Sequence, residues 1–209
     1  MIARNPGTLA QNLILSSRLG LVSIPPEPAR EAASAPAALF EREEAIDALR
    51  RLGNDLGMSC LEPKAESFPE AESGDAAGVE FADEAIRKAY EALDVVWIRG
   101  GEMVAAFVVE NASGPWSGVR RLADALALNP KSKCAYYVLS VPELKLGLLK
   151  EMHRPVYRLL KKPLPEIARI LDWTRLQEEL AQLGERVRYL KPEFLEGISE
   201  ASELPVAVT

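Results

Sequence analysis

The sequence predicts an α/β protein, with one compact domain in which helices flank a β-sheet, preceded by an N-terminal arm and followed by a C-terminal tail. Two observations predict it. The chain has 209 residues, 48% of them hydrophobic, which is enough for one core because domains usually hold about 100 to 200 residues. Segments with helical spacing of apolar side chains also alternate along the chain with short runs rich in β-branched and aromatic residues.

Residues 1–38 are expected to form an arm or linker. A short apolar segment leads into Ile24-Pro-Pro-Glu-Pro28 and Ala32-Ala-Ser-Ala-Pro-Ala-Ala38, where prolines and small residues dominate. Such a composition cannot build a core. We therefore place the domain at residues 39–183 and treat residues 184–209, whose signals are weaker, as the tail.

The first half of the domain is predicted to contain a helix, a loop, a short helix and a hairpin. Phe40 to Leu56 repeats apolar side chains at helical spacing, and Gly57 is suited to end that helix. Residues 62–83 are polar and acidic, which indicates a loop, and Glu84 to Ala92 is expected to be a short helix. Two β-rich runs, separated by the turn signal Arg99-Gly-Gly-Glu102, predict a hairpin over residues 93–110.

The second half is predicted to alternate helices and strands. Asn129-Pro130 should end the first of these helices. The segments expected are a helix over Ser117–Leu128, a buried strand over Cys134–Ser140, a helix over Glu143–Met152, a short strand over Pro155–Leu160, and a helical stretch over Pro165–Leu171 and Trp173–Leu183.

Composition narrows the classes of function. The formal net charge is −6, which argues against a protein that coats nucleic acid through a basic surface but leaves room for local basic patches. No apolar run approaches the ~20 residues that cross a bilayer. The two cysteines lie far apart and the only histidine is His153, so a zinc site is not indicated. We expect a soluble, cytoplasmic protein.

Two acids mark the ends of the predicted hairpin. Asp94 begins its first strand and Glu110 ends its second. Carboxylates from adjacent strands can hold Mg²⁺ beside a phosphate, and the metal then activates a bound water for phosphodiester cleavage. The same spacing also suits solvated strand ends, so both interpretations stay open.

The register of the hairpin separates these interpretations. A two-residue loop at Gly100-Gly101 places Asp94 opposite Phe107, whereas a bulge places it opposite Val108 and on the same face as Glu110. The metal-site hypothesis therefore predicts a bulge or a longer turn at Arg99–Glu102.

Four stretches carry a resemblance to a known family. Leu52-Gly-Asn-Asp-Leu-Gly57, Leu93-Asp-Val-Val-Trp-Ile98, Val104-Ala-Ala-Phe-Val-Val-Glu110 and Ser117-Gly-Val-Arg-Arg-Leu-Ala-Asp124 resemble a bacterial family of PD-(D/E)XK restriction-endonuclease-like proteins. The similarity covers about residues 40–180. It implies a restriction-endonuclease-like core with a mixed β-sheet flanked by helices.

The resemblance also implies a catalytic set. Glu44 would be the helix-borne acid that faces the pocket, Asp94 the main metal ligand, and Glu110 the last motif residue, at a place where many nucleases have a lysine. Two residues before Glu110 the family pattern has another acid, and this chain has Val108. Because an isopropyl group replaces a hard oxygen ligand, we expect affinity for Mg²⁺ to fall sharply.

The start of the predicted helix at Ser117 is a candidate nucleic-acid-binding site. The hypothesis is that Trp116 stacks on a base or sugar, that Ser117 and the helix N-terminus bind phosphate, and that Arg120 and Arg121 add charge. The alternative is that Ser117 is an N-cap, Trp116 a core contact, and the arginines a solvated face.

A second group of basic side chains follows later in the chain. They line one side of a nucleic-acid groove or form a solvated charged face. The group comprises Lys145, Lys150, His153, Arg154, Arg158, Lys161 and Lys162.

Three functions remain open from the sequence. The favoured one is a nuclease-fold pseudoenzyme, derived from a restriction or defence endonuclease, that associates with nucleic acid, DNA rather than RNA, but is catalytically impaired. The second is an active Mg²⁺-dependent endonuclease. The third is a non-catalytic scaffold or interaction subunit, for which a protein partner or a homodimer is expected.

Overall fold

The computed structural model describes residues 13–17, 20–24, 39–61, 81–114 and 116–204. The chain divides into two units, Met1–Pro36 and Ala37–Thr209. In the first unit, β1 (Leu13–Ser17) and β2 (Gly20–Ile24) pair antiparallel as a hairpin, which the sequence did not predict within the expected arm. Most of the loop predicted over residues 62–83 lies outside the described residues.

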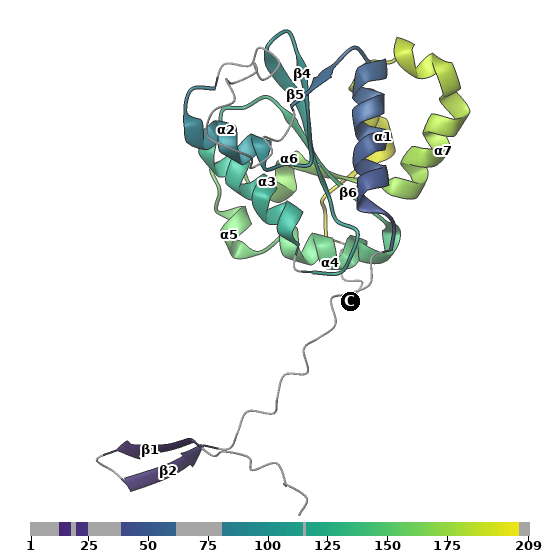
Figure 1. Ribbon diagram of the computed structural model, residues 1–209. Coiled ribbons are helices and arrows are strands. Elements are labelled where there is room, and N and C mark those ends of the chain that lie inside the picture. The colour runs from purple at the N-terminus through teal and green to yellow at the C-terminus, as the bar shows by residue number, and fades with distance from the viewer. Residues whose placement is uncertain (1–12, 18–19, 25–38, 62–80, 115, 205–209) are drawn as a thin grey trace, which may run out of the picture. The chain divides into compact units, whose positions relative to one another are not determined.

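The second unit is built on a six-stranded mixed sheet with the strand order β3-β4-β5-β6-β7-β8 (Figure 1). The pairs β5–β6 and β6–β7 are parallel, and the other three pairs are antiparallel. This confirms the predicted α/β class with a mixed sheet. The strands are β3 (Ser59–Cys60), β4 (Val95–Arg99), β5 (Glu102–Val109), β6 (Ala135–Ser140), β7 (Ala168–Asp172) and β8 (Ser199–Ala201).

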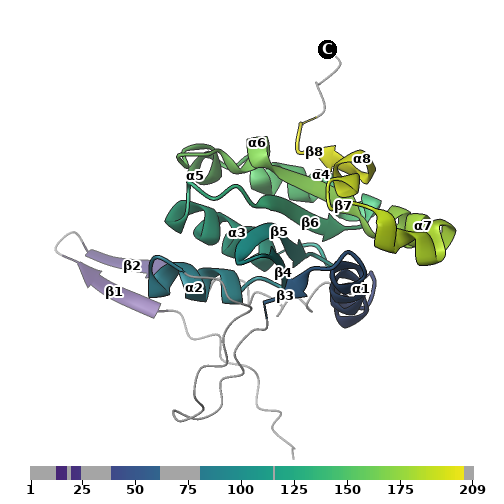
Figure 2. The same ribbon diagram turned by 90° about the horizontal axis from the view of Figure 1, so that it is seen from above.

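Helices cover both faces of this sheet (Figure 2). One face carries α2, α3, α5 and α6, the other carries α1, α7 and α8, and α4 contributes side chains to both cores. The helices are α1 (Arg42–Asp55), α2 (Glu84–Glu91), α3 (Ser117–Leu128), α4 (Pro142–Met152), α5 (Pro155–Arg158), α6 (Leu164–Ile167), α7 (Trp173–Leu183), the 3₁₀ helix η1 (Gly184–Tyr189) and α8 (Phe194–Ile198).

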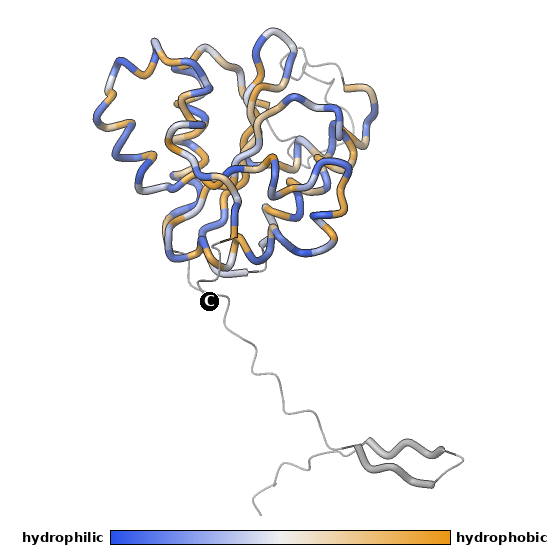
Figure 3. The backbone as a smooth tube through the Cα atoms, turned by 180° about the vertical axis from the view of Figure 1, so that it is seen from behind, coloured by the Kyte–Doolittle hydropathy of each residue, from blue (hydrophilic) through white to orange (hydrophobic). Residues whose placement is uncertain are grey.

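Strand alternation divides the apolar side chains between two cores. In β5, Val108 faces the α3 side and Phe107 faces the α1 side, as successive strand residues must. Phe107 stacks on Tyr137 of β6 with ring centroids 5.2 Å apart. Because both faces are buried, β5 and β6 consist mostly of aliphatic and aromatic residues. Hydrophobic and hydrophilic residues alternate around the helices (Figure 3).

Helix α1 ends as predicted at Gly57. Gly57 has φ +72°, its N–H donates to the Asn54 carbonyl at 3.0 Å, and the Met58 N–H donates to the Gly53 carbonyl at 2.8 Å. These two bonds form a Schellman motif, which satisfies the last carbonyls of the helix. The left-handed conformation at its centre is one that glycine adopts without a Cβ penalty.

The hairpin forms where the sequence predicts it, but the bulge lies elsewhere. Gly100 and Gly101 have positive φ and make a two-residue loop with Arg99 paired to Glu102, so the bulge predicted within that turn is not there. The register shifts one step further on, where Trp97 pairs with Ala105 and leaves Val104 as the extra residue. Val95 then pairs with Phe107, which places Asp94 opposite Val108.

Two predicted elements are wrong. Pro155–Leu160 is not a strand, because Pro155 begins the short helix α5, a position that proline favours. Pro165–Leu171 is not helical throughout, because the chain leaves α6 at Ile167 and enters β7. Parallel pairing of β7 with β6 supplies the stabilisation that overrides the helical pattern of the local sequence.

Residues 184–204, which belong to the predicted tail, continue the same domain. Strand β8 pairs with β7, Leu195 and Ile198 of α8 are buried, and Nε2 of His153 lies 2.6 Å from the Ser202 carbonyl. Within the described ranges, no helix has both the length and the hydropathy to cross a membrane.

Candidate functional site

Asp94 and Glu110 lie together at the end of the hairpin, as predicted. Asp94 precedes β4 and Glu110 follows β5, and the Asp94 N–H donates to the Phe107 carbonyl at 3.1 Å. The bulge at Val104 turns Asp94 to the α3 side of the sheet, which Val108 also faces. Both acids are buried, with Asp94 7% and Glu110 6% exposed.

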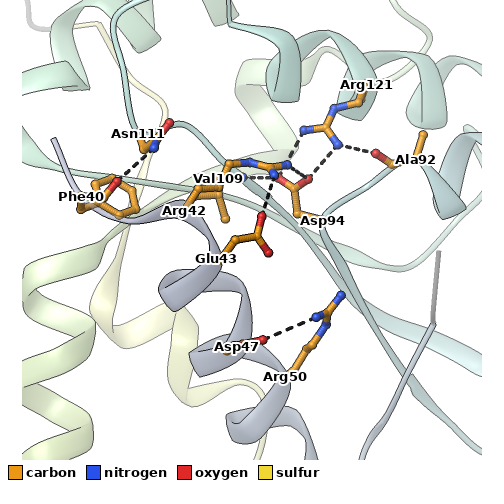
Figure 4. A network of polar contacts seen from close by, with 10 residues as sticks. All are labelled: Phe40, Arg42, Glu43, Asp47, Arg50, Ala92, Asp94, Val109, Asn111 and Arg121. Carbon is orange, nitrogen blue, oxygen red and sulfur yellow. Dashed lines mark hydrogen bonds and ion pairs between the residues drawn. The ribbon is translucent and has the colours of Figure 1, made fainter. Parts of the chain in front are cut away.

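Two arginines and a backbone N–H hold the Asp94 carboxylate (Figure 4). Oδ2 accepts from the Val109 N–H at 2.7 Å. Oδ1 accepts from Nη1 of Arg121 at 2.7 Å, and Nη2 of the same side chain lies 3.3 Å from Oδ2. Arg42 donates to Oδ1 from the opposite side. The Asp94 side chain is only 2% exposed, so these partners replace its hydration.

The two arginines come from different layers of the fold. Arg42 begins α1 and also pairs with Glu43 at 3.5 Å. Arg121 belongs to α3 and also donates to the Ala92 carbonyl at the end of α2. Asp94 therefore links α1, on one face of the sheet, to α3, on the other face, at the start of β4.

Glu110 binds the N-terminus of α3. Its Oε1 accepts from the Val119 N–H at 3.0 Å, and the nearby Gly118 N–H also lowers the pKa of the carboxyl. Trp116, the N-cap residue, supplies no side-chain cap, so Glu110 satisfies N–H groups that a helix end leaves without partners. Burial raises the pKa of Glu110 from its usual 4.5, against the lowering effect of these N–H groups and of Arg121.

The contact between Glu110 and α3 requires a glycine. A Cβ on Gly118 would lie 2.9 Å from Oε1 of Glu110 and 2.9 Å from Cβ of Val108. Such distances are shorter than van der Waals contact, so α3 would have to move away from β5. Gly118 thus permits the close approach of helix and carboxylate.

Trp116 packs against the protein core. It is half-buried and packs against the side chains of both cores, and its ring lies against Gly147 of α4, 2.9 Å from where a Cβ would be. Its backbone has φ +55°, a conformation that costs a bulky residue about 1 kcal/mol or more. This matches the core-contact alternative for Trp116, and stacking on a base stays a prediction.

The other predicted residues take different places. Ser117 is exposed and is the first residue of α3, not its N-cap, so the capping alternative is wrong. Arg120 is exposed, whereas Arg121 is committed to Asp94. Glu44 is exposed in the first turn of α1 and takes no part in the polar network around Asp94.

The residues present do not fit a magnesium ion. Mg²⁺ prefers an octahedron of oxygen ligands, of which carboxylates supply one or two beside waters and substrate phosphates. In the described part of the chain, no group of three or more His, Cys, Asp and Glu side chains is placed to hold a metal. The charges of Arg42 and Arg121 already face Asp94, so a cation there would meet two positive groups.

Arg42 is the member of this polar network that the sequence did not reveal. It lies 52 residues from Asp94 along the chain, and no local pattern joins them. One signal was available, because a cation in the first turn of a helix is opposed by the helix dipole and therefore suggests an acidic partner elsewhere.

The fold and the site define a restriction-endonuclease-like α/β domain, with two acids at the end of a hairpin and helices on both faces of a mixed sheet. Residues 70–202, more than half of the chain, match the family described as the Type II restriction enzyme NmeDI C-terminal domain. The chain belongs to this family. No curated protein and no solved structure shows significant similarity to the chain.

Proposed function

We propose that this protein is a DNA-associated, restriction-type domain of the PD-(D/E)XK class in which metal-dependent cleavage is impaired. Membership of a restriction-enzyme family supports the association with DNA. The observation that carries the impairment is the commitment of Asp94 to Arg42, Arg121 and the Val109 N–H.

Charge balance supports this proposal. Asp94 contributes one negative charge, and Arg42 and Arg121 both pair with it, so the charge of this carboxylate is already compensated. A divalent cation would have to displace at least one guanidinium and leave that arginine without its carboxylate. Separating a buried carboxylate from its partner is costly, and that cost would reduce metal affinity.

Val108 stands at a position where a metal site would need a further oxygen ligand. It is fully buried and faces the α3 layer, beside Gly118. The side chain occupies the position where the resembled family has an acid, so the site has apolar surface where a metal would need oxygen.

A nicking assay on supercoiled plasmid tests the proposal. With Mg²⁺ or Mn²⁺, the native protein is expected to cut no faster than Asp94→Asn, because neither form holds a metal. Asp124→Asn, which changes an exposed acid on α3, is the matched control. Metal-dependent nicking by the native protein and by the control, with none by Asp94→Asn, would contradict the proposal.

An active Mg²⁺-dependent endonuclease is the second candidate. One observation favours it, because the bulge at Val104 brings Asp94 to the face of Val108 and beside Glu110, as a metal site on this hairpin requires. The same nicking assay decides between the two functions.

A further inference from the structure

A basic surface lies on α5 and the segment that follows it. Residues 152–165 contain no Asp or Glu, and within them stand His153, Arg154, Arg158, Lys161 and Lys162. The protein as a whole has a net charge of −6, so this stretch is basic within a chain that is acidic overall. We call residues 154–162, together with Arg120, the α5 surface.

The cations of the α5 surface are exposed and largely uncommitted. Arg154, Arg158 and Lys161 are exposed. Arg154 pairs with Glu151 at 3.0 Å, but no ion pair among the described residues includes Arg158 or Lys161. Neither of these two side chains is therefore held in an ion pair, and Arg158 lines a cavity together with Glu166 and Glu203.

Neighbouring elements extend the surface. Burial and the nearby Glu151 raise the pKa of the Tyr157 hydroxyl, and the charges of Arg154 and of Arg120 on α3 lower it, so both arginines lie near this hydroxyl. Lys162 donates to the Ser132 carbonyl at 2.9 Å, which joins the turn after α3 to the same region. The surface thus draws on α3, α5 and the segment after α5, which lie on one side of the sheet (Figures 1 and 2).

Apolar side chains are exposed between these cations. Val156 is 56% and Leu159 is 85% exposed. Sugars and base edges in a groove offer apolar contacts beside phosphates, and proteins that bind the minor groove often insert Leu or Ile there. The combination of uncommitted cations with exposed aliphatic groups therefore suits a nucleic-acid backbone.

We propose that the α5 surface binds the phosphate backbone of duplex DNA, with Arg158 and Lys161 as its principal phosphate contacts. This inference rests on the proposed function and deepens it by assigning the DNA contact to α5 and not to the Asp94 end of the hairpin. Phosphate contacts position a protein on DNA and supply sequence-independent affinity. Within the candidate site Arg121 is paired with Asp94, so it has no charge to spare for phosphate.

Binding of a labelled 25-base-pair duplex, measured by fluorescence anisotropy over a series of salt concentrations, tests the inference. The variant is Arg158→Gln/Lys161→Gln. The matched control is Arg186→Gln/Lys191→Gln, which removes one arginine and one lysine that are also exposed and lie on or beside η1. Both variants change the net charge by the same amount, and circular dichroism melting checks that both remain folded.

The α5 variant is expected to bind about tenfold or more weakly at low salt, and the slope of log affinity against log salt should fall by about 2, as for the loss of two phosphate contacts. The control should keep the native slope. Equal losses in both variants would overturn the inference, because affinity would then follow net charge and not this surface.

The outcomes also separate the inference from the proposed function. If the native protein binds duplex and the α5 variant binds equally well, the inference fails and the proposed function stands. If the native protein binds no duplex at low salt, both fail. Tighter binding to an RNA hairpin of equal length, or to an acidic polypeptide such as polyglutamate, would overturn the assignment to duplex DNA.

Discussion

The Asp94 site and the α5 surface use charge in opposite ways. At the Asp94 site, two arginines of the same chain pair with the Asp94 carboxylate, and a backbone N–H donates to the Glu110 carboxylate. On the α5 surface, Arg158 and Lys161 are exposed and unpaired within the described residues. The comparison teaches that the charged residues predicted from sequence as functional are of two kinds. Some pair with other groups of the same chain, and others are exposed and can contact a partner. The predictions below test this division.

The largest effect is expected from Asp94→Ala. Removing the carboxylate leaves Arg121 without its ion-pair partner, Arg42 with only Glu43, and the Val109 N–H without an acceptor. Loss of one member of a buried ion pair should lower the free energy of unfolding by about 3 kcal/mol, measured by urea denaturation. The control Asp55→Ala, at an exposed position of α1, should stay within about 0.5 kcal/mol. Similar losses for both variants would show that Asp94 is not structural.

Gly118→Ala should have the next largest effect. The new Cβ would lie 2.9 Å from both Glu110 and Val108, so α3 must move, at a cost of roughly 1–2 kcal/mol from overpacking. Gly197→Ala is the matched control, because nothing lies within 4 Å of its Cβ position. That substitution in α8 should be neutral or stabilising. A stabilised Gly118→Ala variant would contradict the close approach of Glu110 to α3.

The pH dependence of stability reports on Glu110. Because its folded-state pKa is raised above the usual 4.5, the folded protein keeps a proton that the unfolded chain has lost, and stability from this group falls as pH rises from that value through the folded pKa. Glu110→Gln removes this titration. The stability of the variant relative to the native protein should therefore increase between pH 4 and pH 7.5, as measured by denaturant unfolding at each pH. A relative stability that falls over this range would mean that the pKa is lowered.

Ser117→Ala should have the smallest effect. Ser117 is exposed and follows the N-cap residue of α3, so the change in the free energy of unfolding should stay below about 0.5 kcal/mol. In contrast, Asp172→Ala removes a true N-cap, whose Oδ1 accepts from the Thr174 N–H at 2.9 Å, and should cost about 1 kcal/mol. Thermal melting of the two variants provides the comparison. A larger loss for Ser117→Ala would assign its hydroxyl a structural bond.

The sequence predicted the elements whose signals are local. The Gly100-Gly101 turn, the apolar spacing of α1 and α3, and the stop at Gly57 each depend on neighbouring residues. β7 and β8 could not be predicted in this way. β7 forms by parallel pairing with β6. Ser199-Glu-Ala201 has no strong strand preference and forms β8 by pairing with β7.

The same limit applies to the candidate site. Spacing along the hairpin predicted that Asp94 and Glu110 end adjacent strands. The resemblance predicted that Glu44 faces the pocket, but Glu44 is exposed. The polar partners of both acids are set by tertiary packing, since Arg42 reaches Asp94 from another helix and the N-terminus of α3 reaches Glu110. The sequence therefore predicted where the acids lie but not what neutralises them.

Calorimetric titration with Mn²⁺ tests most directly the claim that arginines, and not a metal, neutralise Asp94. The native protein is expected to give no binding heat that differs from Asp94→Asn, because Arg42 and Arg121 already hold the carboxylate. Stoichiometric Mn²⁺ binding by the native protein that disappears in Asp94→Asn would contradict the account.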